Sequence, residues 1–228
     1  MIMTYKNIIL GIFISRPNRF IAEVEIEGNI EICHVKNTGR CKELLIPGVT
    51  VYVQRADNPN RTTKYDLIAV RKGERLINMD SSAPNKVFLE YLQKGTYIKD
   101  VTLIKPEARY GASRFDFYVE AGGRRIFIEV KGVTLEENGV VMFPDAPTER
   151  GVKHLNELAR CVSEGYEAHV VFVIQMSDVK YFIPNNHTHP AFGAALVAAK
   201  QAGVAVAAFD CEVDEDSLEI RNAVEVRL

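Results

Sequence analysis

The sequence predicts a two-domain protein, in which a small β-barrel over residues 1–82 precedes an α/β domain over residues 83–228. Three observations predict this organisation. Short apolar runs separated by turns fill the first 80 residues, and longer amphipathic segments alternate with strand-like runs after them. The pattern changes between Asp80 and Pro84. With 228 residues, 47% of them hydrophobic and 25% charged, the chain has the composition of an ordinary globular protein and can form two cores.

The first part is expected to form about five short strands with one helical turn between them, which predicts a barrel of the OB type. Turns are expected at 16–19 and 27–29, where Pro, Asn and Gly gather. The helical turn is expected at 39–46. The strand-like runs are Ile8–Ile14, Phe20–Ile26, Ile30–Val35, Val49–Gln54, Tyr65–Val70 and Arg75–Met79.

The second part is expected to follow the order α-β-β-β-α-β-α-β. Thr148 is expected to cap a helix that runs to Glu164, because its hydroxyl can accept a hydrogen bond from the first turn and apolar residues recur on one face. The helix at 190–201 precedes a β-branched strand, so it should pack on a sheet and not form a helix-turn-helix. The other elements are a helix at 86–94 and strands at Val101–Tyr110, Arg114–Glu120, Arg125–Lys131, Ala168–Met176 and Val204–Cys211.

Charge is distributed unevenly along the chain. The formal net charge is −2, which argues against a strongly basic nucleic-acid binder. Residues 1–80 carry 12 Lys and Arg against 9 Asp and Glu, whereas residues 210–228 carry 2 against 7. A local basic face is therefore compatible with the overall value. The acidic stretch Asp210–Glu219 is expected to be a solvated edge strand that discourages edge pairing.

The chain is expected to be cytoplasmic, with no contact with a membrane. Its apolar runs are shorter than the roughly 20 residues that cross a bilayer, and the N-terminus lacks the cleavage pattern of a signal peptide. The four cysteines have no CxxC spacing and are expected to be reduced thiols. A metal site of Cys33, His34 and Cys41 is a less favoured alternative.

A β-hairpin at residues 113–131 carries the most informative charges. Gly122 and Gly123 are a natural two-residue turn, so cross-strand partners should sum to 245 and Asp116 should lie opposite Glu129. Alternation assigns two faces. The apolar core face is Phe115, Phe117, Val119, Ile126, Ile128 and Val130, and the other face is Arg114, Asp116, Tyr118, Phe127, Glu129 and Lys131.

Two opposed carboxylates repel each other unless a cation lies between them. Asp116 and Glu129 are therefore the candidate ligands of Mg²⁺ or Mn²⁺, and Lys131 would face a water molecule or a developing phosphate charge. The alternative is an inert strand face with cross-strand salt bridges. The sequence supports the metal site and the inert face about equally.

Blocks of residues along nearly the whole chain resemble the sugar fermentation stimulation protein A family, and the hairpin resembles the PD-(D/E)xK nuclease superfamily. Two positions depart from the family pattern: Lys36 stands where many members have Pro, and His189 stands where Asp is expected. The blocks are His34–Arg40, Glu43–Leu45, Pro47–Gly48, Tyr65–Ile68, Ala83–Val87, Tyr110–Phe117, Glu129–Leu135, Phe143–Ala146, Thr148–Leu155 and Ile174–Met176.

The resemblance implies an OB-like barrel followed by a restriction-endonuclease-like α/β domain, DNA binding, and a link to the regulation of sugar use, notably maltose. It assigns Asp116, Glu129 and Lys131 to the nuclease triad and Glu90 to an additional acid on the first helix. It also implies that the helix from Thr148 presents its N-terminus and basic side chains to phosphate. The candidate nucleic-acid-binding residues are Arg16, Arg19, His34, Asn37, Arg40 and Lys42 in the barrel, and Arg150, Lys153 and His154 on that helix.

Two function classes follow from these residues. The leading hypothesis is a Mg²⁺- or Mn²⁺-dependent phosphodiesterase that acts on nucleic acid, taken to be DNA. The alternative is a non-catalytic DNA-binding regulator of sugar metabolism on a nuclease scaffold. Opposed carboxylates favour the enzyme, because a protein that only binds nucleic acid has no need for them.

Overall fold

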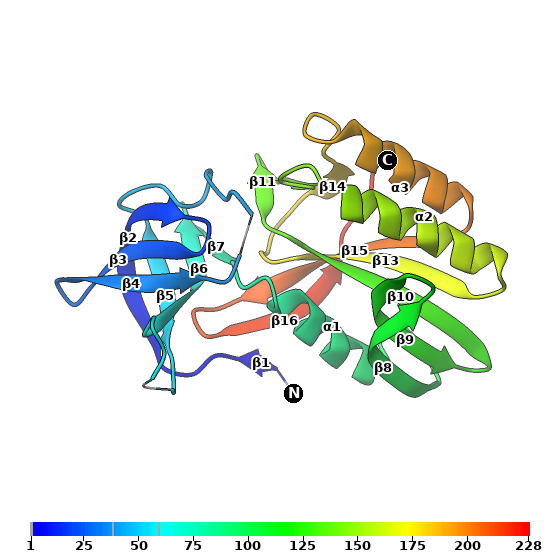
Figure 1. Ribbon diagram of the computed structural model, residues 1–228, viewed down its shortest axis with the longest axis horizontal. Helices are drawn as coiled ribbons and strands as arrows, with labels where there is room; N and C mark the ends of the chain where they lie inside the picture. Colours follow the sequence, from blue (N-terminus) through cyan, green and yellow to red (C-terminus); the bar gives the residue numbers. More distant parts are fainter. Residues whose placement is uncertain (1, 38, 59) are drawn as a thin grey trace.

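The computed structural model describes residues 2–37, 39–58 and 60–228, and Figure 1 shows a barrel beside a larger α/β part. The barrel strands follow the order β4-β3-β2-β5-β6, and a parallel pairing of β4 with β6 closes the ring. β7 extends the sheet beyond β6. The predicted OB-type barrel is confirmed. The strands are β2 (Ile8–Asn18), β3 (Ile21–Ile26), β4 (Asn29–Val35), β5 (Thr50–Arg55), β6 (Tyr65–Lys72) and β7 (Arg75–Asn78).

One local prediction in the barrel is wrong. The turn expected at 16–19 lies later, because β2 continues to Asn18 and the chain turns at Arg19 and Phe20. The helical turn expected at 39–46 is present as one hydrogen-bonded turn, in which the Leu45 N–H donates to the Cys41 carbonyl at 2.9 Å.

The α/β part is built on a seven-stranded sheet in the order β1-β16-β15-β13-β10-β9-β8. β10, β13 and β15 are parallel, and the other pairings are antiparallel. The N-terminal strand β1 joins this sheet before the chain enters the barrel, so two segments of the chain connect the barrel with the α/β part. The strands are β1 (Met3–Thr4), β8 (Val101–Tyr110), β9 (Ser113–Ala121), β10 (Arg124–Val133), β13 (Glu167–Ile174), β15 (Ala205–Val213) and β16 (Ser217–Ala223).

Three helices cover the two faces of this sheet. α1 (Ala83–Gln93) lies on one face, and α2 (Glu149–Ser163) and α3 (Pro190–Gln201) lie together on the other (Figure 1). As predicted, the Thr148 hydroxyl caps α2, since it accepts from the Gly151 N–H at 3.0 Å. α3 leads into β15 and packs on the sheet, as expected, since its buried Phe192 and Leu196 lie in the same apolar core as Phe172 of β13. No helix in the described part of the chain combines the length and apolarity needed to span a bilayer.

Two predictions about the α/β part are wrong. β15 lies between β13 and β16, so Asp210–Val213 are not at an edge of the sheet, and the two residues of β1 pair with Ser217 and Leu218 of β16. Phe115 was expected on the same face as Phe117. It packs instead against Phe127 and His154, on the part of β9 that lies beyond the last β9–β10 pair, Phe117 with Ile128.

A small second sheet, ordered β11-β12-β14, has no counterpart among the predicted elements. Its strands have only three or four residues, which is too short for a periodic pattern. In Figure 1, β11 stands between the barrel and the α/β part. The strands are β11 (Leu135–Glu137), β12 (Val140–Phe143) and β14 (Tyr181–Pro184).

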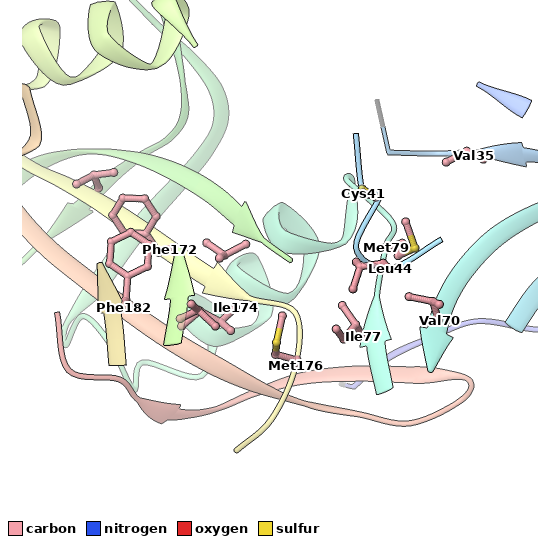
Figure 2. Packing of buried hydrophobic residues seen from close by; sticks show 14 of the residues in the cluster. Val35, Cys41, Leu44, Val70, Ile77, Met79, Phe172, Ile174, Met176 and Phe182 are labelled. Atoms are coloured by element: carbon pink, nitrogen blue, oxygen red, sulfur yellow. The ribbon is translucent and has the colours of Figure 1, made fainter. Parts of the chain in front are cut away.

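One apolar core continues from the barrel into the α/β part. Figure 2 shows Leu44, Ile77 and Met79 of the barrel side next to Ile174 and Met176 at the end of β13. All five side chains are buried. Burying apolar surface on both sides of the boundary disfavours free motion of the barrel relative to the sheet.

Candidate active site

The β9–β10 hairpin has the predicted register. Partners from Arg124 and Ala121 to Ile128 and Phe117 all sum to 245. Gly122 and Gly123 both have positive φ, as a tight two-residue turn requires. The ladder stops one pair before Asp116 and Glu129. There the Asp116 carboxylate takes over the role of a strand acceptor, because its Oδ2 receives the Val130 N–H at 2.7 Å.

Asp116 lies between the hairpin and α1. Its Oδ1 accepts from the Asn85 side-chain amide at 2.8 Å. Burial, together with the negative charge of Glu129, raises the pKa of Asp116 to about 6. Asn85 lies within a block quoted for the family resemblance, but no sequence signal assigned it a role at the site.

Glu129 is 4% exposed and is held by two cationic or polar neighbours. Lys131 Nζ lies 2.5 Å and His154 Nδ1 lies 2.6 Å from the same oxygen, Oε1. Burial alone would raise the pKa of Glu129, but the hydrogen bond from His154 and the charge of Lys131 outweigh it and hold the pKa below its usual value. Among the described residues, the second oxygen, Oε2, is buried without a partner.

This donor set fits a hard divalent cation. Two neighbouring carboxylates supply oxygen ligands, and the orphaned Glu129 Oε2 is a buried acceptor without a donor. The described residues contain no group of three or more His, Cys, Asp or Glu placed to hold a metal ion. The alternative site of Cys33, His34 and Cys41 is therefore absent, and all four cysteines are free and buried. At the hairpin, other ligands would have to come from water, backbone or phosphate.

A basic cavity of about 480 Å³ adjoins Glu129 through His154. The first turns of α2 provide Glu149, Arg150 and Lys153, and the start of β9 provides Arg114. Arg150 Nε lies 3.4 Å from His154 Nε2. The structure thus brings Arg150, Lys153 and His154 together beside the carboxylates, as a phosphate-binding surface requires.

Glu90 is not brought to this cluster by any hydrogen bond or ion pair in the described part of the chain. One helical turn later, Lys94 pairs with Glu219 of β16 at 2.6 Å, so this side of α1 faces β16. Asn85, five residues before Glu90, is the α1 side chain that contacts Asp116.

The candidate barrel residues divide into internal and exposed groups. Arg16 is internal, because its guanidinium donates to the backbone carbonyls of Asn37, Gly39, Arg40 and Arg19 at 2.7–2.9 Å. This arginine holds the loop 37–40 in place and has little left for a phosphate. Thr38, within that predicted loop, lies outside the described residues.

Two further members of the barrel set are also tied to neighbours. His34 Nδ1 lies 3.1 Å from Asp66, and the Asn37 side chain accepts from the Gly39 N–H at 2.8 Å. The other three, Arg19, Arg40 and Lys42, are exposed. Arg19 also lies over the ring of Phe20, 4.6 Å from its centroid.

Fold and site together define a class of two-domain proteins, in which an OB barrel precedes an α/β domain with a buried carboxylate pair beside a lysine. Residues 14–79 match the family model described as "SfsA N-terminal OB domain". Residues 82–217 match "Sugar fermentation stimulation protein RE domain". The chain belongs to the sugar fermentation stimulation protein family.

Relatives support this membership over the whole length of the chain. Sugar fermentation stimulation protein homologs of Clostridium beijerinckii and Desulfitobacterium hafniense are 65% and 66% identical over 226 residues, covering 99% of this chain and 100% and 99% of the relatives. The solved structure described as "The structure of Pyrococcus Furiosus SfsA in complex with Ca2+" is 29% identical. It aligns with a TM-score of 0.91 and covers 100% of this chain and 99% of that one.

Proposed function

We propose that this protein is a divalent-metal-dependent phosphodiesterase that binds and cleaves nucleic acid, with DNA as the substrate class. The observation that carries the proposal is the cluster around Glu129, in which one oxygen is held by Lys131 and His154 and the other is buried without a partner among the described residues. A buried acceptor of this kind is costly unless a cation or donor arrives.

Asp116 and Glu129 would hold Mg²⁺ or Mn²⁺. When bound, such an ion supplies an activated water and neutralises charge on a phosphate group. The related Pyrococcus furiosus protein was solved in complex with Ca²⁺, a cation that also prefers oxygen ligands, and this supports a divalent site in the family.

The chain's own residues supply the remaining functions. The Lys131 ammonium is a donor at the edge of the carboxylate pair, where charge would develop on phosphate. The Asn85 amide and the Val130 N–H fix both oxygens of Asp116. Arg114, Arg150 and Lys153 line the adjoining cavity and would hold the phosphate backbone.

A second candidate function is a non-catalytic DNA-binding regulator linked to sugar use, including maltose. One observation favours it: Lys131 and His154 both hold Glu129 Oε1, so the chain's own donors satisfy this carboxylate oxygen. A scaffold that only binds DNA could keep this arrangement for stability.

The experiment is a calorimetric titration of Mn²⁺ into the full chain, into Asp116→Asn and into Glu129→Gln, beside cleavage of end-labelled DNA and RNA in Mg²⁺. We expect saturable metal binding and cleavage in the wild type and loss of both in each variant. Glu25→Gln, which alters an exposed carboxylate on β3, is the matched control and should change neither.

Cleavage that persists in Asp116→Asn or Glu129→Gln would overturn the assignment of these residues. If metal binds neither alone nor with an oligonucleotide present, and DNA still binds, the non-catalytic regulator is the correct function.

A further inference from the structure

A second cavity lies beside the carboxylate cluster, and nothing in the proposed reaction uses it. Its volume is about 330 Å³, at the lower end of the range of about 300–1,000 Å³ for small-molecule sites. Both parts of the protein line it, as ligand sites at domain boundaries often are. We call it the boundary pocket and define it by Asn37, Leu135, Met142, Phe143, Asp145 and Gln175 among its lining residues.

The boundary pocket lies where two parallel strands of the large sheet end. β10 and β13 run side by side to Val133 and Ile174, and the Gln175 N–H donates to the Val133 carbonyl at 2.9 Å. Ligands of open α/β sheets bind in crevices at the carboxyl ends of such strands. Gly132, which also lines the pocket, directly follows Lys131 on β10. The pocket thus begins one β10 residue beyond Lys131.

One wall of the boundary pocket is apolar and fixed. Leu135, Met142 and Phe143 are half-buried along this wall. The Phe143 ring packs against Phe172 and Phe192, with centroid separations of 5.8 and 5.1 Å. A ring clamped by two others is a rigid surface, which suits stacking of a planar group.

The rest of the lining is polar and crosses the domain boundary. Asp145 approaches the barrel loop so closely that a Cβ added at Gly39 would overlap its Oδ2. A Cβ added at Gly132 would lie 2.7 Å from both Gln175 Oε1 and Pro84 Cγ. Glycine at these two positions allows these close approaches, and a side chain there would force its neighbours to shift.

The charges in the two cavities assign them different ligands. Among the described residues that line the boundary pocket, none is Lys or Arg, and Asp145 is the charged one. Phosphate therefore fits the basic cavity of Arg114, Arg150 and Lys153 and does not fit here. A carboxylate accepts hydrogen bonds from the exocyclic amino group of a base, as Asp and Glu do from cytosine.

We propose that the boundary pocket receives one nucleobase of the bound strand, stacked on Phe143, and that Asp145 selects a base with an exocyclic amino group over thymine or uracil. The proposal rests on the proposed function and adds a specificity site to it. It predicts a base preference that comes from the pocket and a backbone affinity that comes from the basic cavity.

The test uses the full chain labelled with ¹³C at the methionine methyl groups, in EDTA so that no cleavage occurs. Met142 lines the pocket and reports its occupancy, and Met3, on β1, is the internal control. The ligands are dCMP, dTMP, inorganic phosphate, and oligo-dC and oligo-dT. Fluorescence anisotropy of the labelled oligonucleotides measures binding separately.

We expect the Met142 resonance to shift saturably with dCMP and oligo-dC, the Met3 resonance to stay in place, and oligo-dC to bind roughly tenfold more tightly than oligo-dT. Asp145→Ala, which removes the acceptor, should abolish that preference without changing the thermal midpoint. The proposal is overturned if oligonucleotides bind while Met142 does not shift, if phosphate alone produces the same shift, or if Asp145→Ala keeps the preference.

Failure of the proposed function can be distinguished from failure of the boundary pocket. If Mg²⁺-dependent cleavage is absent, the EDTA titrations still decide the pocket. If no oligonucleotide binds, the dCMP titration decides it: a saturable shift of Met142 supports the pocket, and no shift overturns it.

Discussion

His154 Nδ1 lies 2.6 Å from Glu129 Oε1, and this hydrogen bond joins α2 to β10 at the centre of the carboxylate cluster. An ionised carboxylate only accepts, so the hydrogen lies on Nδ1 and the Nε2 lone pair faces Arg150. Both residues are nearly buried, at 4% exposure each. The basic helix and the acidic hairpin are thus one hydrogen-bonded unit.

This unit predicts the effect of His154→Gln. Loss of the imidazole removes a donor that orients Glu129, and residues that orient metal ligands typically contribute 10- to 100-fold to affinity or activity. We expect Mn²⁺ affinity and the cleavage rate to fall by roughly tenfold to a hundredfold, as measured by calorimetry and single-turnover cleavage.

Lys153→Ala is the matched control for His154→Gln. Lys153 precedes His154 on α2 but is exposed and makes only a 3.9 Å ion pair with Glu157. Its removal should leave Mn²⁺ affinity unchanged and weaken DNA binding at low salt. Equal loss of metal affinity in both variants would mean that His154 acts through general destabilisation of α2.

Asp80 predicts a second result, on stability. This carboxylate is fully buried in the link between the barrel and α1, and its Oδ2 lies 2.6 Å from Lys36 Nζ. Ser82 donates to Oδ1 through its N–H and its hydroxyl. Burial would raise the pKa of Asp80, but these partners hold it below the usual value.

Asp80→Asn should therefore lower the free energy of unfolding by about 2–4 kcal/mol, measured by urea denaturation, because it breaks a buried pair by removing one partner. Arg221→Ala is the comparison, since Arg221 and Glu212 form an ion pair in which both side chains are 52% exposed. That change should leave the free energy of unfolding nearly unchanged, because solvent screens an exposed ion pair. Similar costs for both variants would contradict the role given to Asp80.

The hairpin shows how far the sequence predicts this site. The Gly122–Gly123 turn determines the register up to Phe117 and Ile128, so Asp116, Glu129 and Lys131 could be placed near one another from sequence, although the ladder ends one pair before Asp116 and Glu129. Asn85 could not, because its contact with Asp116 depends on how α1 packs on the sheet, 31 residues away. Local patterns carry no information about such packing.

The same limit explains two other differences. Arginine commonly binds phosphate, yet Arg16 donates its hydrogen bonds to backbone carbonyls of loop 37–40, which lie 21 to 24 residues further along the chain. The boundary pocket is lined by β11 and β12, which are too short to leave a periodic signal. Both features come from tertiary structure.

Glu136 predicts a pH dependence of stability. It accepts from Lys72 and Arg75 of the barrel, at 2.8 Å each, and lies beside a hollow of about 1320 Å³. Burial would raise its pKa, but Lys72, the Gly139 N–H and Arg75 outweigh it and lower the pKa from its usual 4.5 to about 2.

Because the folded-state pKa is below the unfolded one, the unfolded chain binds more protons as pH falls, and the stabilisation by Glu136 is lost between about pH 5 and pH 2. At pH 7 the free energy of unfolding should be about 1–2 kcal/mol higher for the wild type than for Glu136→Gln. The difference is modest because solvent screens the partly exposed cations. The gap should close as the pH approaches 2, as measured by urea denaturation across pH. A gap that stays constant over this range would contradict the assignment.

The last prediction compares Arg16, which holds the barrel loop 37–40, with Arg40, which belongs to that loop. Arg16 donates to four backbone carbonyls, whereas Arg40 is exposed. Arg40→Ala should leave the free energy of unfolding unchanged and reduce the slope of log affinity against log salt by about 0.7, as expected for one lost phosphate contact on a single strand. Arg16→Ala should lower the free energy of unfolding by about 2 kcal/mol, since it leaves several carbonyls without a donor. Salt-dependent anisotropy and urea denaturation measure the two effects, and an Arg40→Ala variant with an unchanged slope would remove this part of the barrel from the nucleic-acid surface.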